Sequence, residues 1–222
     1  IHSGDAGERA MTLNEFNTFL IWFDSQPARK KIYVAGNHDH VMSKTWMLNL
    51  KANDSIAGLI GRQMYEDARR LLEKYPNVTY LENKEYIFEG IKFYGSPYSP
   101  SFHPDRWCFN ANRGTKIASI WGKIPSDVDV LITHTPPHGI LDFVEEITEE
   151  ETDQHRGCEV LMEVIKKRLF KLKLHAFGHI HENFGYVNVP ISNKRRGFFS
   201  NGAVLTHYTK DSLIIHPLVI TI

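Results

Sequence analysis

The sequence predicts a layered α/β fold built around a mixed β-sheet. Short apolar runs typical of strands alternate with amphipathic helical segments over most of the chain, and strand-like runs alone follow toward the carboxyl end. Alternating elements of this kind favour stacked layers of helices and sheet. The 222 residues show no internal repeat, low-complexity segment or linker. We therefore expect a single domain over residues 1–222.

Helices are expected where apolar residues recur at helical spacing. The first begins after Thr12, a favourable N-cap, and ends before Pro27. A second, longer helix precedes Pro76. The expected helices cover residues 12–23, 55–75, 115–121 and 157–169. The faces expected to be buried in the first two consist of Phe16, Phe19, Leu20 and Phe23, and of Ile60, Met64, Ala68, Leu71 and Leu72.

Strands are expected at the short apolar runs, with Glu89 and Gly90 as a hairpin turn. The connection over residues 95–114 is long and rich in proline and aromatic residues, which favours a lid or substrate contact as much as a small local core. The expected strands are residues 1–3, 31–35, 78–81, 85–89, 91–94, 128–133 and 172–177, then runs near Val187, at 198–199, at 204–207 and at 213–222.

Composition narrows the classes of function. Lys plus Arg and Asp plus Glu both total 26, so the formal net charge is zero. The absence of excess positive charge argues against a polynucleotide partner. A small phosphorylated substrate remains compatible, because a bound metal can supply positive charge locally. Cys108 and Cys158 are far apart and form no disulfide framework, which favours the cytoplasm. No run approaches the ~20 apolar residues of a membrane span.

Polar residues of metal-ligand type follow four of the apolar runs. They are Asp5, the Gly-Asn-His-Asp segment at residues 36–39, His134, and the Gly-His-Ile-His segment at residues 178–181. Sites in open α/β folds lie at the carboxyl ends of strands. Each cluster alone has a simpler explanation, such as a turn residue or a hydrogen-bonded histidine. The four together predict a metal site with oxygen and imidazole ligands and no thiolate.

Such ligands suit Mn²⁺, Fe or Zn²⁺. Five candidate ligands are more than one ion needs, and two ions sharing a carboxylate would account for them. Two ions about 3.5–4 Å apart can stabilise both oxygens of a phosphoryl displacement and activate water. Hydrolysis of a phosphoester is therefore the expected chemistry. The other histidines, namely His2, His40, His103, His138, His175, His207 and His216, are expected to have structural or surface roles.

These motifs, in this order, resemble those of the calcineurin-like metallophosphoesterases. The resemblance runs from residue 4 to about residue 205 and implies a four-layer α/β/β/α sandwich of mixed sheets. Residues 95–97 (Gly-Ser-Pro), 133–137 (Thr-His-Thr-Pro-Pro) and His155-x-Gly157-Cys158 resemble a narrower branch, the metallophosphoesterase-domain phosphodiesterases.

The resemblance also implies roles for individual residues. Asp5 would bridge two divalent ions. Asn37, His134 and His179 would complete one site, and His181 would belong to the other. His38 would stabilise the transition state or protonate the leaving oxygen, with Asp39 orienting it, while a bridging hydroxide attacks phosphorus in line. Asn37 and His38 would also contact substrate, and His155 is a further candidate for substrate binding.

The sequence departs from the family pattern in two places, of which the first concerns the second metal site and the other the loop after Asp5. The opening Asp-x-His, which would supply its other ligands, does not occur at the start, and we expect it on a first strand upstream of Ile1. Asp153-Gln154-His155 has the same spacing but follows an acidic loop, so we interpret it as coincidence. The loop after Asp5 also departs from the usual Asp-x-x-x-x-Gly ending.

The expected activity is metal-dependent hydrolysis of a small phosphodiester, with a cyclic nucleotide as one candidate. Three alternatives remain open at this point. They are a phosphomonoesterase resembling protein phosphatases, a nuclease, and a non-catalytic module that retains the fold and one metal. For the basic triplet at residues 194–196, a solvated charged loop is a simpler interpretation than a nucleic-acid contact.

Overall fold

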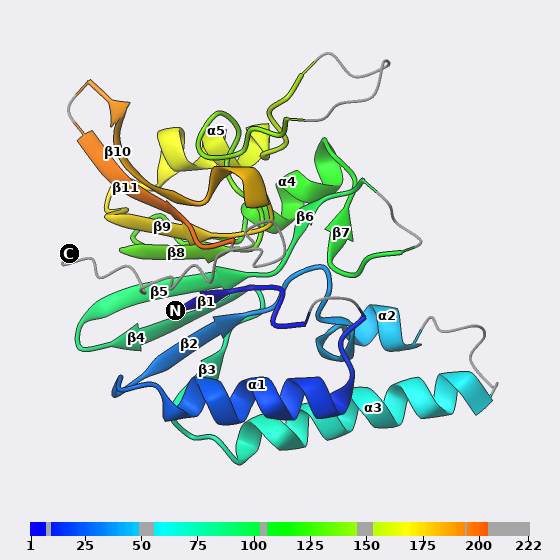
Figure 1. Cartoon of the computed structure of the whole chain (residues 1–222). Coiled ribbons are helices and arrows are strands. Elements are labelled where there is room, and N and C mark those ends of the chain that lie inside the picture. Colours follow the sequence, from blue (N-terminus) through cyan, green and yellow to red (C-terminus); the bar gives the residue numbers. More distant parts are fainter. Residues whose placement is uncertain (8–9, 49–55, 103–105, 146–152, 194, 204–222) are drawn as a thin grey trace.

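Two β-sheets stack face to face between two layers of helices (Figure 1). The computed structural model describes residues 1–7, 10–48, 56–102, 106–145, 153–193 and 195–203. Within them lie a three-stranded sheet of order β1-β2-β3 and a six-stranded sheet of order β10-β11-β9-β8-β5-β4. The predicted four-layer α/β/β/α sandwich of mixed sheets is thus confirmed.

The three-stranded sheet is parallel throughout, whereas the larger sheet has antiparallel pairs at both edges, β10 with β11 and β4 with β5. Strands β6 and β7 form a separate short parallel pair. The strands are β1 (His2–Ser3), β2 (Lys31–Val34), β3 (Val78–Tyr80), β4 (Lys84–Phe88), β5 (Ile91–Ser96), β6 (Ser99–Pro100), β7 (Asn110–Ala111), β8 (Val130–Thr133), β9 (Leu174–Phe177), β10 (Gly185–Ser192) and β11 (Arg195–Asn201).

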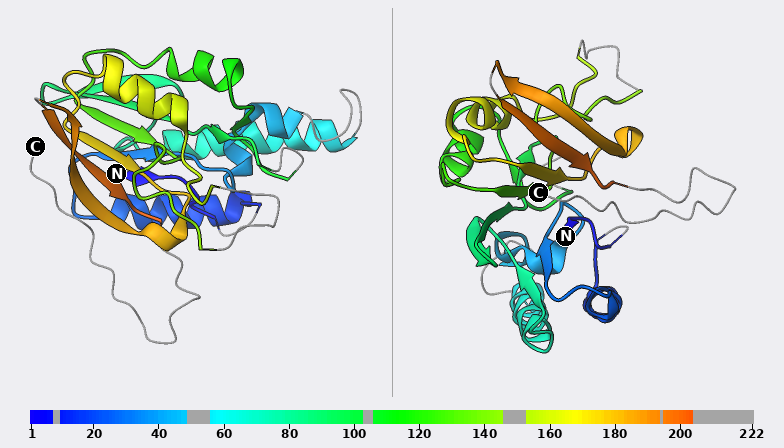
Figure 2. Two further views of the ribbon diagram at one scale, coloured as in Figure 1. Left: turned by 90° about the horizontal axis from the view of Figure 1, so that it is seen from above. Right: turned by 90° about the vertical axis from the view of Figure 1, so that its left-hand side faces the viewer.

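Helices α1 and α3 cover the outer face of the small sheet, and α4 and α5 cover the outer face of the large one, as Figure 2 shows from two further directions. Short helical segments follow β2 and β9. The helices are α1 (Leu13–Ser25), α2 (Lys44–Leu48), α3 (Ile56–Glu73), α4 (Thr115–Trp121) and α5 (Glu159–Arg168), and the 3₁₀ turns are η1 (His40–Met42) and η2 (His181–Asn183).

Local sequence explains why α1 begins where it does. The Thr12 side chain accepts a hydrogen bond from the Glu15 backbone N–H, and the Glu15 carboxylate accepts one from the Thr12 N–H, which completes a capping box. The four residues predicted to face inward are all buried. They pack with Tyr33 of β2 against the small sheet.

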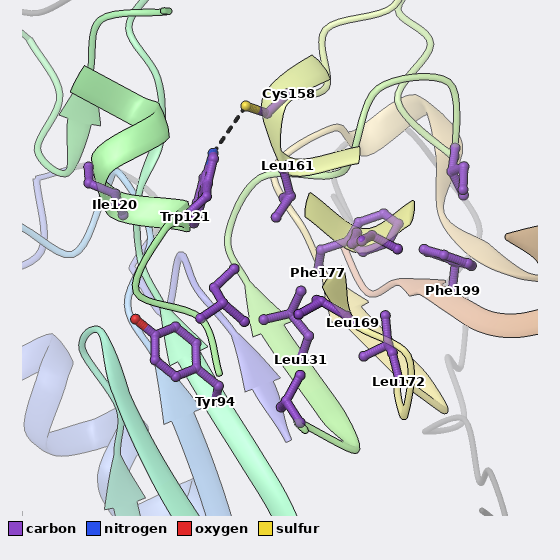
Figure 3. Packing of buried hydrophobic residues seen from close by; sticks show 14 of the residues in the cluster. Tyr94, Ile120, Trp121, Leu131, Cys158, Leu161, Leu169, Leu172, Phe177 and Phe199 are labelled. Carbon is purple, nitrogen blue, oxygen red and sulfur yellow. Dashed lines mark hydrogen bonds between the residues drawn. The ribbon is translucent and has the colours of Figure 1, made fainter. Parts of the chain in front are cut away.

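Alternation along the strands separates the apolar layers. Ile32 and Val34 of β2 face the large sheet, where they meet Val130 and Ile132 of β8, while Tyr33 between them faces the helices. On the other side of the large sheet, Leu131, Phe177 and Phe199 pack under α4 and α5 (Figure 3). The stacked sheets are therefore held by three apolar layers with two-residue periodicity.

A sulfur–indole contact ties α4 to α5 in the outer layer. The Trp121 Nε1–H donates to Cys158 Sγ at 3.2 Å, and both residues are fully buried (Figure 3). Burial raises the pKa of the Cys158 thiol above its ordinary value. Cys158 therefore serves packing, and both cysteines are free thiols.

One prediction of local structure is wrong, and others lie outside the described residues. Ile60 was expected inside but is 54% exposed, because the amino-terminal turns of α3 project beyond the small sheet (Figure 1). The long connection at residues 95–114 contains the β6/β7 pair, and Cys108 and Phe109 join the core beneath the small sheet. The strands expected at 204–207 and 213–222, and most of the acidic loop at 145–153, lie outside the described residues.

No described helix has the length and apolar character needed to cross a bilayer.

Candidate metal centre

Parallel strands bring the predicted ligands to one place. β1 and β2 are parallel neighbours in the small sheet, and β8 and β9 are parallel neighbours in the large sheet. Their carboxyl ends carry Asp5, residues 36–39, His134 and residues 178–181. One carboxylate or imidazole atom from each of Asp5, His134 and His179 lies within 4.8 Å of the others. Residues far apart in the sequence thus form one compact donor group.

His134 is held so that one ring nitrogen faces this group. Its Nδ1 lies 3.0 Å from the Ser3 carbonyl oxygen, an acceptor, so Nδ1 carries the proton. Its Nε2 lies 2.7 Å from Asn37 Oδ1 and 3.3 Å from Asp5 Oδ2. The side chain is fully buried. A backbone carbonyl on the far nitrogen is the usual device that fixes a metal-binding histidine.

His134 Nε2, Asn37 Oδ1 and Asp5 Oδ2 are arranged as ligands of a cation would be. With Nδ1 protonated, a neutral His134 directs an Nε2 lone pair at two oxygens that are themselves electron-pair donors. Such an arrangement is repulsive unless a positive charge, either a proton or a metal ion, lies among the atoms. His179 Nδ1 or Nε2 and the Asp5 carboxylate add donors within the same space. The oxygen and imidazole set suits Mn²⁺, Fe or Zn²⁺.

Glycine is required at two positions beside this group. A Cβ on Gly4 would lie 2.3 Å from His134 Nδ1, and a Cβ on Gly36 would lie 2.3 Å from Asp5 Oδ1. Gly4 also has φ +108°, which side chains rarely tolerate. Asp5 and His179 themselves have φ of 57° and 75°. Backbone strain at both ligand positions is typical of functional sites.

The charges of Asp5 and His134 reinforce each other. Burial alone would raise the pKa of Asp5, but the charge and hydrogen bond of His134 outweigh it and hold that pKa well below its usual range. Burial likewise works to lower the pKa of His134, yet Asp5 raises it above its ordinary value. Burial lowers the pKa of His179 to about 3. The ionised Asp5 carboxylate and the neutral His179 imidazole are thus in the states that bind a metal ion.

Asp39 has a different task from the predicted one. It was expected to orient His38, but its carboxylate accepts the backbone N–H groups of Asp5 (3.0 Å), Ala6 (2.9 Å) and Gly36 (2.7 Å). No hydrogen bond between Asp39 and the His38 ring occurs among the described residues. Burial and the Asp5 charge raise the pKa of Asp39 to about 7. Asp39 therefore joins the two loops that carry Asp5 and Asn37.

His38 is instead positioned by its backbone and by an aromatic ring. Its N–H donates to Asp5 Oδ1 at 2.9 Å, and its C=O accepts from the Met11 N–H at 3.0 Å. The Trp107 ring lies over the imidazole, with centroids 4.3 Å apart. On the opposite strand ends, Phe102 packs near His179 at 5.3 Å. The aromatic connection thus contributes rings at the site as well as core residues.

His181 is apart from the compact group. It is exposed at the start of η2, and it does not join Asp5, His134 and His179 within the 4.8 Å limit. Its role at a second ion stays a prediction. The described residues thus bring together donors for one ion more completely than for two.

His155 occupies a separate contact network. Its Nδ1 lies 2.7 Å from Asp142 Oδ1, while Asp153 accepts from the His155 backbone N–H and pairs with His138 Nε2 at 3.1 Å. Asp153 therefore does not act with the His155 ring, as the coincidence interpretation of Asp-x-His expected. Among the remaining histidines, the buried His175 bonds Thr133 Oγ1, and burial lowers its pKa to about 3. His40 is also buried, whereas His103, His207 and His216 lie outside the described residues.

Some contributors to the site escaped sequence reasoning. The Ser3 carbonyl is a backbone group with no sequence signal. Cys108 holds the Asn37 loop from behind, since its backbone N–H donates to the Asn37 carbonyl at 3.2 Å. Trp107 and Asp142 lie in no recognisable motif. Trp107 does belong to the aromatic connection at residues 95–114, for which substrate contact and a small local core were equal alternatives.

Comparison with known proteins identifies the class of protein. The family model of the calcineurin-like phosphoesterases matches residues 1–183. The human metallophosphoesterase domain-containing protein 1 is 37% identical over 204 residues, covering 86% of this chain and 59% of the relative. A UPF0046 protein of Caenorhabditis elegans is 32% identical over 214 residues, covering 96% of this chain and 69% of the relative.

A solved crystal structure superposes with a TM-score of 0.55 at 18% identity, covering 86% of this chain and 63% of the other, which supports the fold alone. The chain spans about three-fifths of the human relative's length (59%). The extent of the family match nevertheless leaves no ambiguity about class. The chain belongs to the calcineurin-like phosphoesterase family.

Proposed function

We propose that this chain catalyses metal-dependent hydrolysis of a small phosphodiester, with a cyclic nucleotide as one candidate substrate. The observation that carries the proposal is the convergence of Asp5, Asn37, His134 and His179, with His38 beside them. Divalent ions held there would supply Lewis acidity and an activated water. Mn²⁺ is the first ion to test, with Fe, Zn²⁺ and Ni²⁺ as alternatives.

The residues of the chain then have distinct tasks. Asp5, Asn37, His134 and His179 hold the ions. His38 donates a proton to the leaving oxygen or stabilises charge on the phosphoryl group, and such a group contributes typically 10²–10⁴-fold. Trp107 limits the movement of the His38 ring. Asp39 maintains the loops, because its carboxylate joins Asp5 to Gly36.

A diester is preferred over a monoester for two reasons. The chain has no net charge, and its narrower motifs resemble those of the metallophosphoesterase-domain phosphodiesterases. A polynucleotide is disfavoured because Arg195 bonds the Leu169 and Ile165 carbonyls and Arg196 bonds Asn188. These cations are thus engaged within the fold. Free, buried cysteines are in keeping with a cytoplasmic location.

The test compares bis-p-nitrophenyl phosphate with p-nitrophenyl phosphate in the presence of Mn²⁺. We expect a higher kcat/KM for the diester and no turnover after chelation. Preference for the monoester would instead establish a phosphomonoesterase. Turnover of neither ester with any of the four metals would overturn the enzymatic proposal in favour of a metal-binding module. Salt-sensitive cleavage of DNA would favour the nuclease.

A further inference from the structure

A buried carboxylate outside the metal group is fully committed to hydrogen bonds. Asp142 has no exposed surface. Its Oδ2 accepts the backbone N–H groups of Gly139 at 3.0 Å and Gly157 at 2.9 Å, and its Oδ1 lies 2.7 Å from His155 Nδ1. Since an ionised carboxylate only accepts, Nδ1 is the donor. Asp142 therefore holds the His155 ring in one orientation and one tautomer.

The His155 ring packs beside the rings of His138 and Phe143, with centroids 5.5 Å and 5.9 Å away, and the rest of its surface is open to solvent. The side chain is 42% exposed, while its partner Asp142 is 0% exposed. With Nδ1 bound to Asp142, Nε2 is the atom left for an external group. A carboxylate behind a histidine is the arrangement by which proteins prepare an imidazole to act on a ligand or substrate. A histidine that only contributes polarity to the surface would not need a buried carboxylate to orient its ring.

The loop that carries the pair is hydrogen-bonded to the segment that follows β9. Phe143 pairs with His155 in an antiparallel bridge, and the Phe143 N–H donates to Asn183 Oδ1 at 2.8 Å. Asn183 belongs to η2, the turn that begins at His181. Asn201 Nδ2 joins the same two loops, since it donates to the carbonyls of Leu141 and Ile180. The loop that carries Asp142 and pairs with His155 is thus joined to the turn that carries His181.

The motif His155-x-Gly157-Cys158 is explained by this pair. A Cβ on Gly157 would lie 2.7 Å from Asp142 Oδ2 and 2.6 Å from the Pro137 carbonyl, so no other residue fits. Cys158 anchors the segment through Trp121 and through a parallel bridge to Pro137. Each residue of the motif serves the placement of the His155 ring.

We propose that His155 is a substrate-binding residue whose Nε2 hydrogen-bonds an oxygen of the substrate phosphate, with Asp142 as its positioning residue. The proposal rests on the proposed function for its substrate, a phosphoester held at the metal centre. The simpler alternative is that His155 only satisfies the buried Asp142 carboxylate. The two alternatives differ in which ring nitrogen matters.

Substitution by asparagine separates the two nitrogens. In His155→Asn the amide nitrogen takes the place of Nδ1 and keeps a donor for Asp142, but nothing replaces Nε2. The measurement is the affinity of the Mn²⁺-loaded chain for inorganic phosphate by titration calorimetry. We expect affinity to fall about tenfold, the worth of one hydrogen bond to a charged group. KM for bis-p-nitrophenyl phosphate should rise by about the same factor.

Two further variants complete the experiment. His138→Asn is the comparison variant: the His138 ring packs 5.5 Å from that of His155 and pairs with the exposed Asp153, but it has no buried acid behind it, so phosphate affinity should fall less than in His155→Asn. Asp142→Asn keeps the side-chain volume but replaces the acceptor that orients the ring, so it should weaken phosphate binding. The double variant Asp142→Asn/His155→Asn should bind no worse than His155→Asn alone, since positioning an absent ring has no effect.

The outcomes are separable. Wild-type phosphate affinity in His155→Asn, or no phosphate binding by the wild type, would overturn the role of Nε2. Equal losses in His138→Asn and His155→Asn would likewise overturn it. If phosphate binding behaves as expected but no ester is hydrolysed, the proposed function fails while the phosphate site stands. If esters are hydrolysed and His155→Asn is unaffected in both assays, only the present inference fails.

Discussion

The two sheets contribute their halves of the site in different ways. On the small sheet, the loop at residues 36–40 is tied to its surroundings by the Asp39 carboxylate, by Cys108 and by Met11. On the large sheet, the imidazoles of His179 and His181 make no hydrogen bond among the described residues. Their loop is tied by backbone bonds, such as Gly178 N–H to the His134 carbonyl at 3.0 Å.

The difference between these two sets of hydrogen bonds shows how the site is organised. The small-sheet half is fixed by the protein itself, so its geometry should survive without metal. The large-sheet half presents imidazoles whose orientation a metal would complete, with His134 as the exception because Ser3 holds its ring. Each prediction below alters one half or the connection between them.

The largest effect is expected from Asp5, which connects the halves. Its Oδ1 accepts the His38 N–H, and its Oδ2 faces His134. Asp5→Asn should lose bound metal and reduce turnover to background, because a neutral amide cannot replace the carboxylate as an anionic ligand. Metal content after desalting and turnover of bis-p-nitrophenyl phosphate measure this. Asp67→Asn, on the exposed face of α3, is the control; full metal content in Asp5→Asn would contradict the assignment.

His38→Ala should remove chemistry while leaving the ions in place. We expect a fall in kcat of about 10²–10⁴-fold, the usual contribution of a general acid. Metal content should equal that of the wild type, because the contact of His38 with Asp5 is made by its backbone N–H. Loss of metal in this variant would identify His38 as a ligand instead.

Removal of Asp39 should loosen the small-sheet half. Asp39→Ala leaves the backbone N–H groups of Asp5, Ala6 and Gly36 without their acceptor. The free energy of unfolding should therefore fall by about 1–3 kcal/mol. Metal affinity should fall as well, because the Asp5 loop loses its anchor. Chemical denaturation and metal titration measure the two effects. Unchanged stability would show that water or backbone shifts satisfy these groups.

Trp107 offers a smaller change in the same half. Trp107→Ala removes the ring that packs on His38 and should lower kcat by about tenfold, since such aromatic contacts contribute about 0.5–1.5 kcal/mol. Trp107→Phe keeps a ring and should retain most turnover. Metal content should be unchanged in both variants. Equal kcat in the alanine and phenylalanine variants would exclude a role for ring packing.

The sequence predicted the fold, and it placed the candidate ligands at strand ends, because both inferences depend on local information. Short apolar runs predict strands, and Thr12 as an N-cap predicts where α1 begins. Each candidate ligand follows the end of a strand, and parallel pairing places the ends of neighbouring strands at the same edge of a sheet. Their metal roles stay predictions, supported by the closeness of Asp5, His134 and His179.

Contacts that depend on the course of the chain were not predictable. Asp39 binds backbone N–H groups of a loop 34 residues earlier, and no sequence pattern specifies how those groups point. The chain returns at Trp107 to cover His38 after a long connection. Ile60 has the right helical spacing, but its exposure depends on where the small sheet ends beneath α3.

Removal of metal by chelation tests the difference between the two halves of the site directly. It is expected to change the structure least of all the perturbations. Chelation leaves every covalent bond intact, so the overall fold should persist. Amide hydrogen exchange should accelerate in residues 178–183, whose histidines lose their partner ion, and stay nearly constant in residues 36–40, which the Asp39 carboxylate and Cys108 hold. Equal acceleration in both segments would mean that the metal, and not the hydrogen-bonded loop, organises the small-sheet half as well.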